Sequence, residues 1–135
     1  MMSKVILDSN FLMLFGTFRG DLFRELDNIV GRRVEKIILK PIYDELQKIS
    51  LIGNSKTRKQ ALAALKIIDM KESTRVDIKL KQLETVDELI IRVAEMWKCL
   101  VATNDGELRK KLIKIGAPVI YLRQRNRLEV KGYRG

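Results

Sequence analysis

The chain has 135 residues, of which 46% are hydrophobic and 33% are charged, so we expect one globular domain around a single core. Its 27 Lys and Arg residues exceed its 17 Asp and Glu residues, and the net charge of +10 suits RNA, DNA, anionic lipid or simple solubility. The absence of histidine excludes Ser-His-Asp and Cys-His catalysis and His-based zinc sites. Any chemistry must therefore use carboxylates, amines, hydroxyls or metal ions.

The elements are predicted from apolar spacing along the chain. Short, nearly continuous apolar runs predict four strands that are covered on both faces, at residues 4–7, 36–39, 99–102 and 119–122. Apolar residues at helical spacing predict helices at residues 21–30, 41–52, 56 to about 70, 86–97 and 104–116. Residues 75–79 alternate apolar and charged side chains, which predicts a short edge strand.

Local signals support several of these helices. Gly31 and Gly53 stand where helices commonly end, and Ser55 is expected to cap the helix that follows it. The inner face of that helix is predicted to contain four apolar residues: Ala61, Leu62, Leu65 and Ile68. In the preceding helix, the inward stripe is predicted to contain Ile42, Ile49 and Ile52.

Strands that alternate with helices predict an α/β fold, a three-layer sandwich with a largely parallel central sheet. We expect residues 1–122 to form the domain. The segment 123–135 has little apolar content and carries five basic residues: Arg123, Arg125, Arg127, Lys131 and Arg134. It is therefore expected to be a basic, loosely attached C-terminal extension.

Two features bear on where the protein works. Cys99 cannot close an intramolecular disulfide, and its apolar neighbours favour a packing role in the core. No apolar run approaches the roughly 20 residues that a bilayer requires, and the N-terminus lacks a signal-peptide pattern. We therefore expect a cytoplasmic protein with no membrane partner.

Four acidic residues stand at the ends of apolar segments: Asp8, Glu45, Asp87 and Asp105. Ligands of parallel sheets gather beyond the carboxyl ends of the strands, and Asp8 and Asp105 each follow a predicted strand. Taken singly, either residue is explained as well by capping of the next helix.

Helical spacing selects between neighbouring acids in two helices. Glu45 lies one turn inside its helix, close enough to the strand ends to reach them, whereas Asp44 shares a face with polar residues. Asp87 aligns with apolar residues, whereas Glu88 aligns with Arg92 and resembles an exposed ion pair. Glu45 and Asp87 are therefore the better candidates for a shared site.

Convergence of these acids would be unfavourable without a cation. Two unit charges about 5 Å apart repel each other by about 3 kcal/mol at an effective dielectric constant near 20. A divalent cation such as Mg²⁺ or Mn²⁺ removes this repulsion, and it lowers the pKa of a bound water. An acidic site in a basic protein thus suggests metal and nucleic acid together.

The motifs that carry these acids form a recognisable series. They are Asp-Ser-Asn-Phe-Leu at 8–12, Pro-Ile-Tyr-Asp-Glu-Leu at 41–46, Val-Asp-Glu-Leu-Ile at 86–90, and Ala-Thr-Asn-Asp at 102–105 followed by Leu108. In this order they resemble the motifs of PIN-domain ribonucleases, over nearly the whole chain. The third and fourth motifs and the basic end from Ile120 onward look most similar to the PIN proteins of ribosomal RNA processing.

The resemblance implies a metal-dependent endoribonuclease. It implies that one or two Mg²⁺ or Mn²⁺ ions, which activate water for attack on an RNA phosphodiester, are bound by Asp8, Glu45, Asp87 and Asp105. Thr103, and Ser9 or Asn10, would orient these carboxylates or a metal-bound water. Glu88, the second acid of the third motif, either assists or only faces solvent.

Two basic segments are candidates for RNA contact. The helix start contributes Lys56, Arg58 and Lys59, and the C-terminal segment contributes Arg123, Arg125 and Arg127. Ordinary solvated charge is the alternative for both segments. Tyr133 lies among cations and is a candidate for stacking on an unpaired base.

Three alternatives stay open from the sequence. The first is the toxin ribonuclease of a toxin-antitoxin pair, with a small antitoxin as partner. The second is a catalytically silent RNA-binding scaffold on ribosomal precursor particles. The third is an aspartyl-phosphate enzyme, which fits less well because such phosphatases need an Asp where this chain has Asn10. A homodimer is compatible with each of them.

Overall fold

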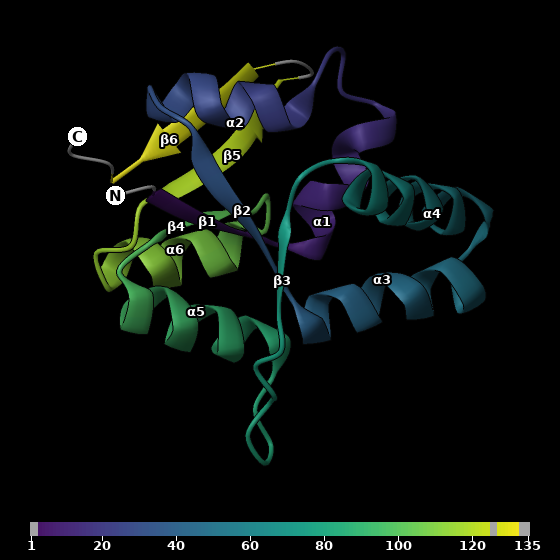
Figure 1. Cartoon of the computed structure of the whole chain (residues 1–135). Coiled ribbons are helices and arrows are strands. Elements are labelled where there is room, and N and C mark those ends of the chain that lie inside the picture. The colour runs from purple at the N-terminus through teal and green to yellow at the C-terminus, as the bar shows by residue number, and fades with distance from the viewer. Residues whose placement is uncertain (1–2, 125–126, 133–135) are drawn as a thin grey trace.

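The computed structural model describes residues 3–124 and 127–132 of the chain (Figure 1). The strands in this part of the chain are β1 (Ser3–Leu7), β2 (Val34–Leu39), β3 (Thr74–Val76), β4 (Leu100–Ala102), β5 (Val119–Arg123) and β6 (Arg127–Lys131). The helices are α1 (Ser9–Leu12), α2 (Leu22–Val30), α3 (Lys40–Ile52), α4 (Ser55–Met70), α5 (Val86–Trp97) and α6 (Gly106–Lys114), with a 3₁₀ helix, η1 (Met13–Gly16).

The strands form one sheet in the order β3-β2-β1-β4-β5-β6. Every neighbouring pair is parallel except β5 and β6, which are antiparallel. The predicted α/β class with a largely parallel central sheet is therefore confirmed. From β1 the chain builds the sheet in one direction through β2 and β3, and it then returns to place β4 on the other side of β1. The boundary between β1 and β4 is thus the point at which the strand order reverses.

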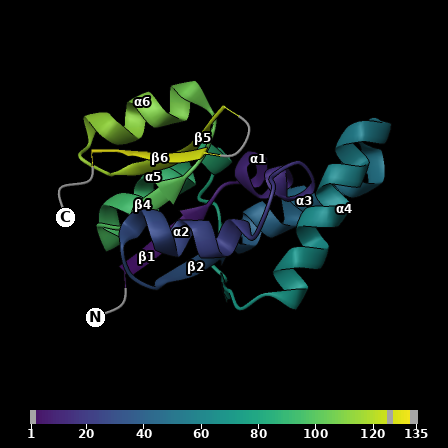
Figure 2. The same ribbon diagram turned by 90° about the horizontal axis from the view of Figure 1, so that it is seen from above.

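Helices cover both faces of this sheet. α5 contacts β4 and α6, and α6 contacts β5, so these two helices lie side by side over one half of the sheet (Figures 1 and 2). The crossovers through α2 and through α3 and α4 run the opposite way along the sheet, and right-handed connections therefore place them on the other face. This gives the three layers that the alternation of elements predicts.

The central strands supply the core. Val5, Ile6 and Leu7 of β1 are fully buried, as expected of a strand with helices on both faces. Cys99 is buried at the start of β4, and this burial raises the pKa of its thiol to about 11. A thiol that stays protonated at neutral pH suits the packing role predicted for it.

Helix boundaries differ from the predicted ones where capping residues decide them. The side chain of Asn54 accepts a hydrogen bond from the N–H of Thr57, so Asn54 caps α4 in place of the predicted Ser55. α6 begins at Gly106 because Asp105, and not Asn104, caps it. The edge strand β3 is shorter than predicted and ends at Val76.

The basic segment after residue 122 is the largest correction. Arg123 completes β5, and β6 pairs with β5 through five registered residues, so the described part of this segment, residues 123–124 and 127–132, is not a loosely attached arm. The predicted boundary at residue 122 falls inside β5. Leu128 and Val130 alternate with charged residues, which is the pattern of a half-buried edge strand, and Leu128 is buried. Arg125, Tyr133 and Arg134 lie outside the described residues.

α3 and α4 project from the sheet as a helical hairpin (Figure 1). Two residues predicted to face inward are exposed, Leu62 by 55% and Ile52 by 71%, because this part of the hairpin extends beyond the sheet. Gly53 permits the tight connection, since a Cβ atom there would lie 2.8 Å from the carbonyl oxygen of Ile49. The apolar periodicity of these helices therefore overstates their burial.

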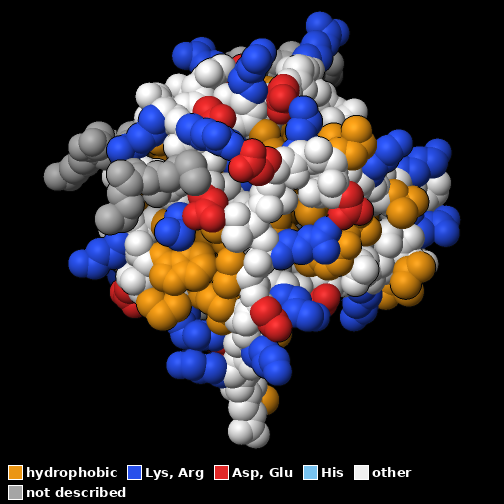
Figure 3. Space-filling view, in the orientation of Figure 1, with side chains coloured by type: hydrophobic (Ala, Val, Ile, Leu, Met, Phe, Trp, Pro, Cys, Tyr) orange, Lys and Arg blue, Asp and Glu red, His pale blue; other side chains and the backbone are white. Residues whose placement is uncertain are grey.

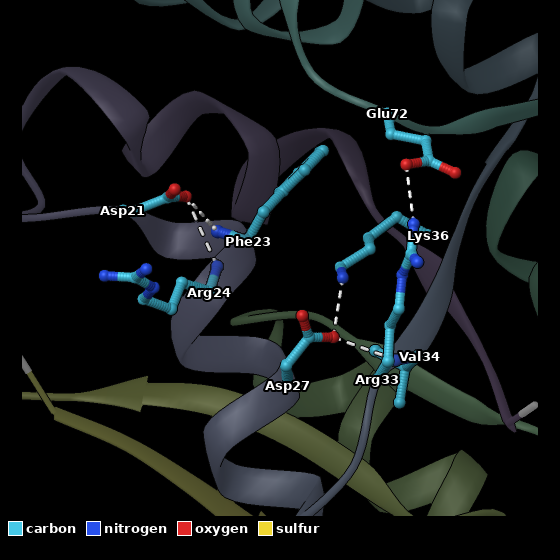
Figure 4. A network of polar contacts seen from close by, with 8 residues as sticks. All are labelled: Asp21, Phe23, Arg24, Asp27, Arg33, Val34, Lys36 and Glu72. Carbon is cyan, nitrogen blue, oxygen red and sulfur yellow. Dashed lines mark hydrogen bonds and ion pairs between the residues drawn. The ribbon is translucent and has the colours of Figure 1, made fainter.

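The strand β2 contains a buried lysine, Lys36, which the sequence predicts only as part of an apolar strand. Lys36 points toward Asp27 of α2, and their 2.6 Å ion pair belongs to a network of polar contacts (Figure 4). Asp27 also accepts a hydrogen bond from the N–H of Val34, so it joins α2 to β2 twice. None of the helices in the described residues is both long enough and apolar enough to span a membrane.

Candidate active site

Asp8 lies at the carboxyl end of β1, at the point where the strand order reverses. Its N–H donates to the carbonyl of Ala102 at 3.0 Å, which extends the pairing of β1 with β4 by one residue. Asp8 as a residue is 4% exposed, and its carboxylate accepts hydrogen bonds from the N–H of Ser9 (2.8 Å), the amide of Asn10 (3.0 Å) and the hydroxyl of Thr103 (2.7 Å). Three donors thus fix the orientation of one buried carboxylate.

Thr103 connects the two strand ends. It is fully buried, and its hydroxyl donates to Oδ2 of Asp8 while it accepts a hydrogen bond from the N–H of Asp105 at 3.1 Å. The side-chain oxygen of Asn10 accepts a hydrogen bond from the N–H of Asn104 at 3.0 Å. The segment after β1 and the segment after β4 are therefore held together by side chains of both.

Asp105 is half-buried and caps α6. Its Oδ1 accepts hydrogen bonds from the N–H groups of Glu107 (3.0 Å) and Leu108 (3.3 Å). Asp8 likewise caps α1 through the N–H of Ser9. The capping interpretation of these two acids is thus correct, but it does not account for the contacts of Asp8 Oδ2 with Thr103 and Asn10.

Glu45 reaches the same region from α3. It is half-buried, and its Oε1 accepts a short hydrogen bond from the hydroxyl of Ser9, which is itself buried beside Asp8. Asp44 is exposed and pairs with Lys40 at 3.0 Å. The helical spacing therefore distinguished the inward acid from its solvated neighbour.

Asp87 and Glu88 occupy different surroundings in the first turn of α5. Asp87 is half-buried, whereas Glu88 is exposed and accepts a hydrogen bond from the N–H of Thr85 in a capping box. Glu88 was predicted to form an exposed ion pair with Arg92, but Arg92 instead donates two hydrogen bonds to Glu84. The structure thus gives Glu88 a capping contact at the start of α5.

Electrostatic coupling joins these carboxylates into one site. Burial raises the pKa of Asp8 to about 6, the hydrogen bonds from Thr103 and Ser9 oppose this shift, and the charges of Asp87 and Glu45 add to it. A carboxyl group that titrates near pH 6 is typical of a functional site and rare in a purely structural cap.

Asp87 extends this coupling to the fourth acid. Its pKa is raised first by burial and then by the charges of Asp105 and Glu45, and the nearby charge of Lys111 on α6 lowers it. Each of the four predicted acids therefore interacts electrostatically with at least one of the others. They come from β1, α3, α5 and the end of β4, which are distant in the sequence.

The donor set has the chemistry of a hard-cation site. All four residues offer carboxylate oxygen, which Mg²⁺ and Mn²⁺ prefer, and their mutual repulsion is the property that a cation would relieve. Among residues 3–124 and 127–132, no group of three or more Asp, Glu, Cys or His side chains is arranged to hold a metal ion. The four acids are coupled electrostatically, and their role as metal ligands is a proposal.

The predicted RNA-binding residues occupy two separate places. Lys56, Arg58 and Lys59 are exposed in the first turns of α4, near the tip of the hairpin, and α3 rises about 10 Å between Glu45 and its end at that tip. Arg123 and Arg127 are exposed and face each other in the β5–β6 pair. On the face seen in Figure 3, Lys and Arg side chains are spread widely, with Asp and Glu side chains between them.

Sequence reasoning missed the part that Asn104 plays. Its side chain makes two hydrogen bonds to the backbone of Leu122, so it continues the sheet where β4 has ended. The sequence contains no signal for this role, because Leu122 lies 18 positions away along the chain. Lys111 was also missed, since its effect on Asp87 depends on how α6 packs beside α5.

With this geometry in view, comparison with known proteins identifies the family. A family model described as a PIN like domain matches residues 5–125, which include all four acids. The chain therefore belongs to the PIN domain family.

Individual relatives agree with this assignment. Ribonuclease VapC4 of Methanocaldococcus jannaschii is 30% identical over 97% of this chain and 98% of its own length. Ribonuclease VapC9 of Archaeoglobus fulgidus is 28% identical over 93% of this chain and 87% of its own length. The solved structure of the PIN domain endonuclease Utp24 is similar with a TM-score of 0.78 and 26% identity, and the match covers 96% of this chain and 92% of that one.

Proposed function

We propose that the protein is a metal-dependent endoribonuclease whose site comprises Asp8, Glu45, Asp87 and Asp105. The observation that carries this proposal is the buried Asp8 carboxylate, with its pKa raised to about 6, beside Asp87 and Glu45 at the reversal point of the sheet. The membership in the PIN domain family and the relatives named ribonucleases support the same activity.

The residues of this chain would divide the work as follows. Asp8, Asp87, Asp105 and Glu45 would hold Mg²⁺ or Mn²⁺, which when bound supplies an activated water and neutralises charge on the phosphate. Thr103 fixes Oδ2 of Asp8 by donating to it, and Ser9 fixes Glu45 in the same way. In Asp105 the α6 N–H groups occupy Oδ1, so Oδ2 is the oxygen offered to a ligand.

Two neighbouring pairs of acids give an internally controlled test of activity. Glu45→Gln and Asp87→Asn should each reduce kcat/KM on single-stranded RNA by about 100-fold or more, because a metal site stabilises the transition state by several kcal/mol. The matched controls Asp44→Asn and Glu88→Gln alter an exposed acid one position away and should retain activity within about twofold. Equal losses in both sets would contradict the proposed site.

Metal removal tests the cofactor separately. Treatment with EDTA should abolish RNA cleavage, and added Mg²⁺ or Mn²⁺ should restore it in the native protein but not in Asp8→Asn. If the native protein binds RNA yet does not cleave it with either metal, the protein is the silent scaffold and the enzyme proposal fails.

We further propose precursor ribosomal RNA as the target and the cytoplasm as the place of action. The likeness to a PIN endonuclease along almost the entire chain, and the motifs noted in the sequence, support this role. The alternative is a toxin ribonuclease with a small antitoxin. Purification from the native cell distinguishes them, because a processing enzyme should carry precursor ribosomal RNA, whereas a toxin should carry a small protein and arrest growth when expressed alone.

A further inference from the structure

A pocket of about 520 Å³ lies between α6 and the β5–β6 pair, next to the acidic site. Tyr121 is paired directly with Glu129, and residues at alternate positions share one face of a sheet. Arg123 and Lys131 therefore lie on the same face as these two residues, which is the face that α6 covers (Figure 2). Arg109 of α6 closes the pocket from above the sheet.

The charge of this pocket sets it apart from others in the described chain. Its lining includes three basic side chains and one acidic side chain. The pocket at the network of Figure 4 has four basic and four acidic side chains, and three ion pairs join six of them: Arg33 with Glu72, Lys36 with Asp27, and Lys71 with Asp21. Two further pockets, one beside the start of α3 and one beside the end of α5, are balanced at two against two and one against one. A net positive pocket favours an anionic ligand.

The single acid of the pocket is already satisfied. Glu129 accepts a hydrogen bond from the hydroxyl of Tyr121 at 2.9 Å and pairs with Arg123 at 3.2 Å. The guanidinium of Arg109 lies 4.3 Å from the centre of the Tyr121 ring, and this stacking holds it in place without neutralising its charge. Arg109 and Lys131 therefore supply the positive charge that remains.

Two residues of the pocket, Arg109 and Asn104, connect it to the acidic site. Arg109 lies one helical turn after Asp105, and its N–H donates to the Asp105 carbonyl at 2.9 Å. Asn104, which lines the pocket, binds Asn10 through its N–H and Leu122 through its side chain. The pocket therefore begins at Asn104, one residue from Asp105, and extends away from the acids toward Lys131.

We propose that this pocket binds a phosphate of the RNA backbone a few nucleotides from the cleaved bond, because Lys131 pairs with Val119 at the end of β5 away from the acids, and that Arg109 and Lys131 are its principal contacts. The proposal rests on the proposed ribonuclease function. A stacked, pre-oriented guanidinium and a lysine that line the same pocket are well suited to a phosphate and carry no preference for base sequence. The pocket would therefore position the strand, and the acids would act on it.

The test measures RNA binding without cleavage, in the Asp8→Asn background with EDTA. The probe is a single-stranded RNA oligonucleotide, and its affinity is measured at several salt concentrations. Arg109→Gln with Lys131→Gln should weaken binding about tenfold and reduce the slope of log Kd against log salt by about 1. The control, Lys110→Gln with Lys114→Gln, removes the same charge from exposed positions of the same helix.

Equal weakening of RNA binding by the two double variants would contradict the proposed phosphate site, because the loss of any two positive charges would then explain both results. An unchanged affinity for the Arg109 and Lys131 variant would overturn it as well. In active protein, the same variant should raise KM with kcat within about twofold, and Arg109→Lys should restore part of the loss. Pocket-dependent binding in a protein that never cleaves RNA would refute the nuclease function while leaving the pocket standing.

Discussion

The Asp8 side chain combines a structural contact with the proposed chemical one. One oxygen caps the short helix α1, and the other is held by Thr103 and Asn10. A helix cap does not need to be buried to 4% exposure beside two further acids. The burial and the charges of Asp87 and Glu45 raise the pKa of Asp8. The same carboxylate is therefore placed by hydrogen bonds and destabilised by its neighbours.

The replacement Thr103→Val removes the buried hydroxyl and keeps the shape of the side chain. Asp8 then loses a donor to its charged form and the N–H of Asp105 loses its acceptor, so stability should fall by about 1–3 kcal/mol. The pKa of Asp8 should rise, so the pH at which activity is half-maximal should also rise. Thr103→Ser keeps the hydroxyl and should restore the pH profile. A profile unmoved in Thr103→Val would contradict the role of this contact.

Asp87 provides a test in which stability and activity move in opposite directions. Its pKa is raised by burial and by Asp105 and Glu45, so Asp87→Asn removes repulsion and should leave the melting temperature of the metal-free protein unchanged or higher. Activity should fall as given above. Glu88→Ala should do the reverse, because it breaks the capping box at a cost of about 1 kcal/mol while RNA cleavage continues. Calorimetry and an RNA cleavage assay on both variants check this pair.

Among the elements, β6 shows why a segment can be misjudged from its composition. Its basic residues suggest a solvated arm. However, an edge strand can form with little apolar content, and in β6 only Leu128 is buried. β6 also satisfies the backbone edge of β5 and covers Tyr121. Its membership in the sheet places Lys131 and Arg123 beside α6, where the proposed phosphate pocket lies.

Leu128→Ala tests the contribution of β6. Removal of this buried side chain should destabilise the protein by about 2 kcal/mol, and the loss should appear in global unfolding because β6 belongs to the sheet. Val130→Ala, at a half-buried position of the same strand, should cost less. A loosely attached arm would instead tolerate Leu128→Ala with no change in the free energy of unfolding, measured with urea.

Strands β1 to β5, the α/β class and the choice of Glu45 over Asp44 could be predicted because each depends on local periodicity. The contacts of Ser9 with Glu45 and of Thr103 with Asp8 could not be derived from periodicity, since they join residues 36 and 95 positions apart. The exposure of Leu62 depends on how far the α3–α4 hairpin projects, which helical spacing does not record. The local sequence pattern was therefore sufficient to select the acids, whereas their hydrogen-bond partners became known only from the structure.

At the scale of the whole molecule, the acidic site should make stability depend on pH. The pKa of Asp8 rises from 3.8 to about 6 on folding, so between these values the folded protein binds more protons than the unfolded protein. The free energy of unfolding should therefore fall as pH rises from about 4 to 6, by up to about 3 kcal/mol from this group. Asp8→Asn should lack this part of the pH dependence, which urea unfolding of both proteins measures.

Mn²⁺ should reverse that loss. A cation binds the ionised carboxylates, so it should raise the melting temperature more at pH 7 than at pH 4.5. Equal stabilisation at both pH values, or the same gain in Asp8→Asn, would show that the ion binds elsewhere.

The most direct measurement is the anomalous diffraction of a crystal soaked in Mn²⁺. We expect a manganese peak bounded by carboxylate oxygens of Asp8, Asp87 and Asp105, with Glu45 in contact directly or through water. The absence of a peak at this site in crystals that hold manganese elsewhere, or side chains of these acids that point apart into solvent, would contradict the account.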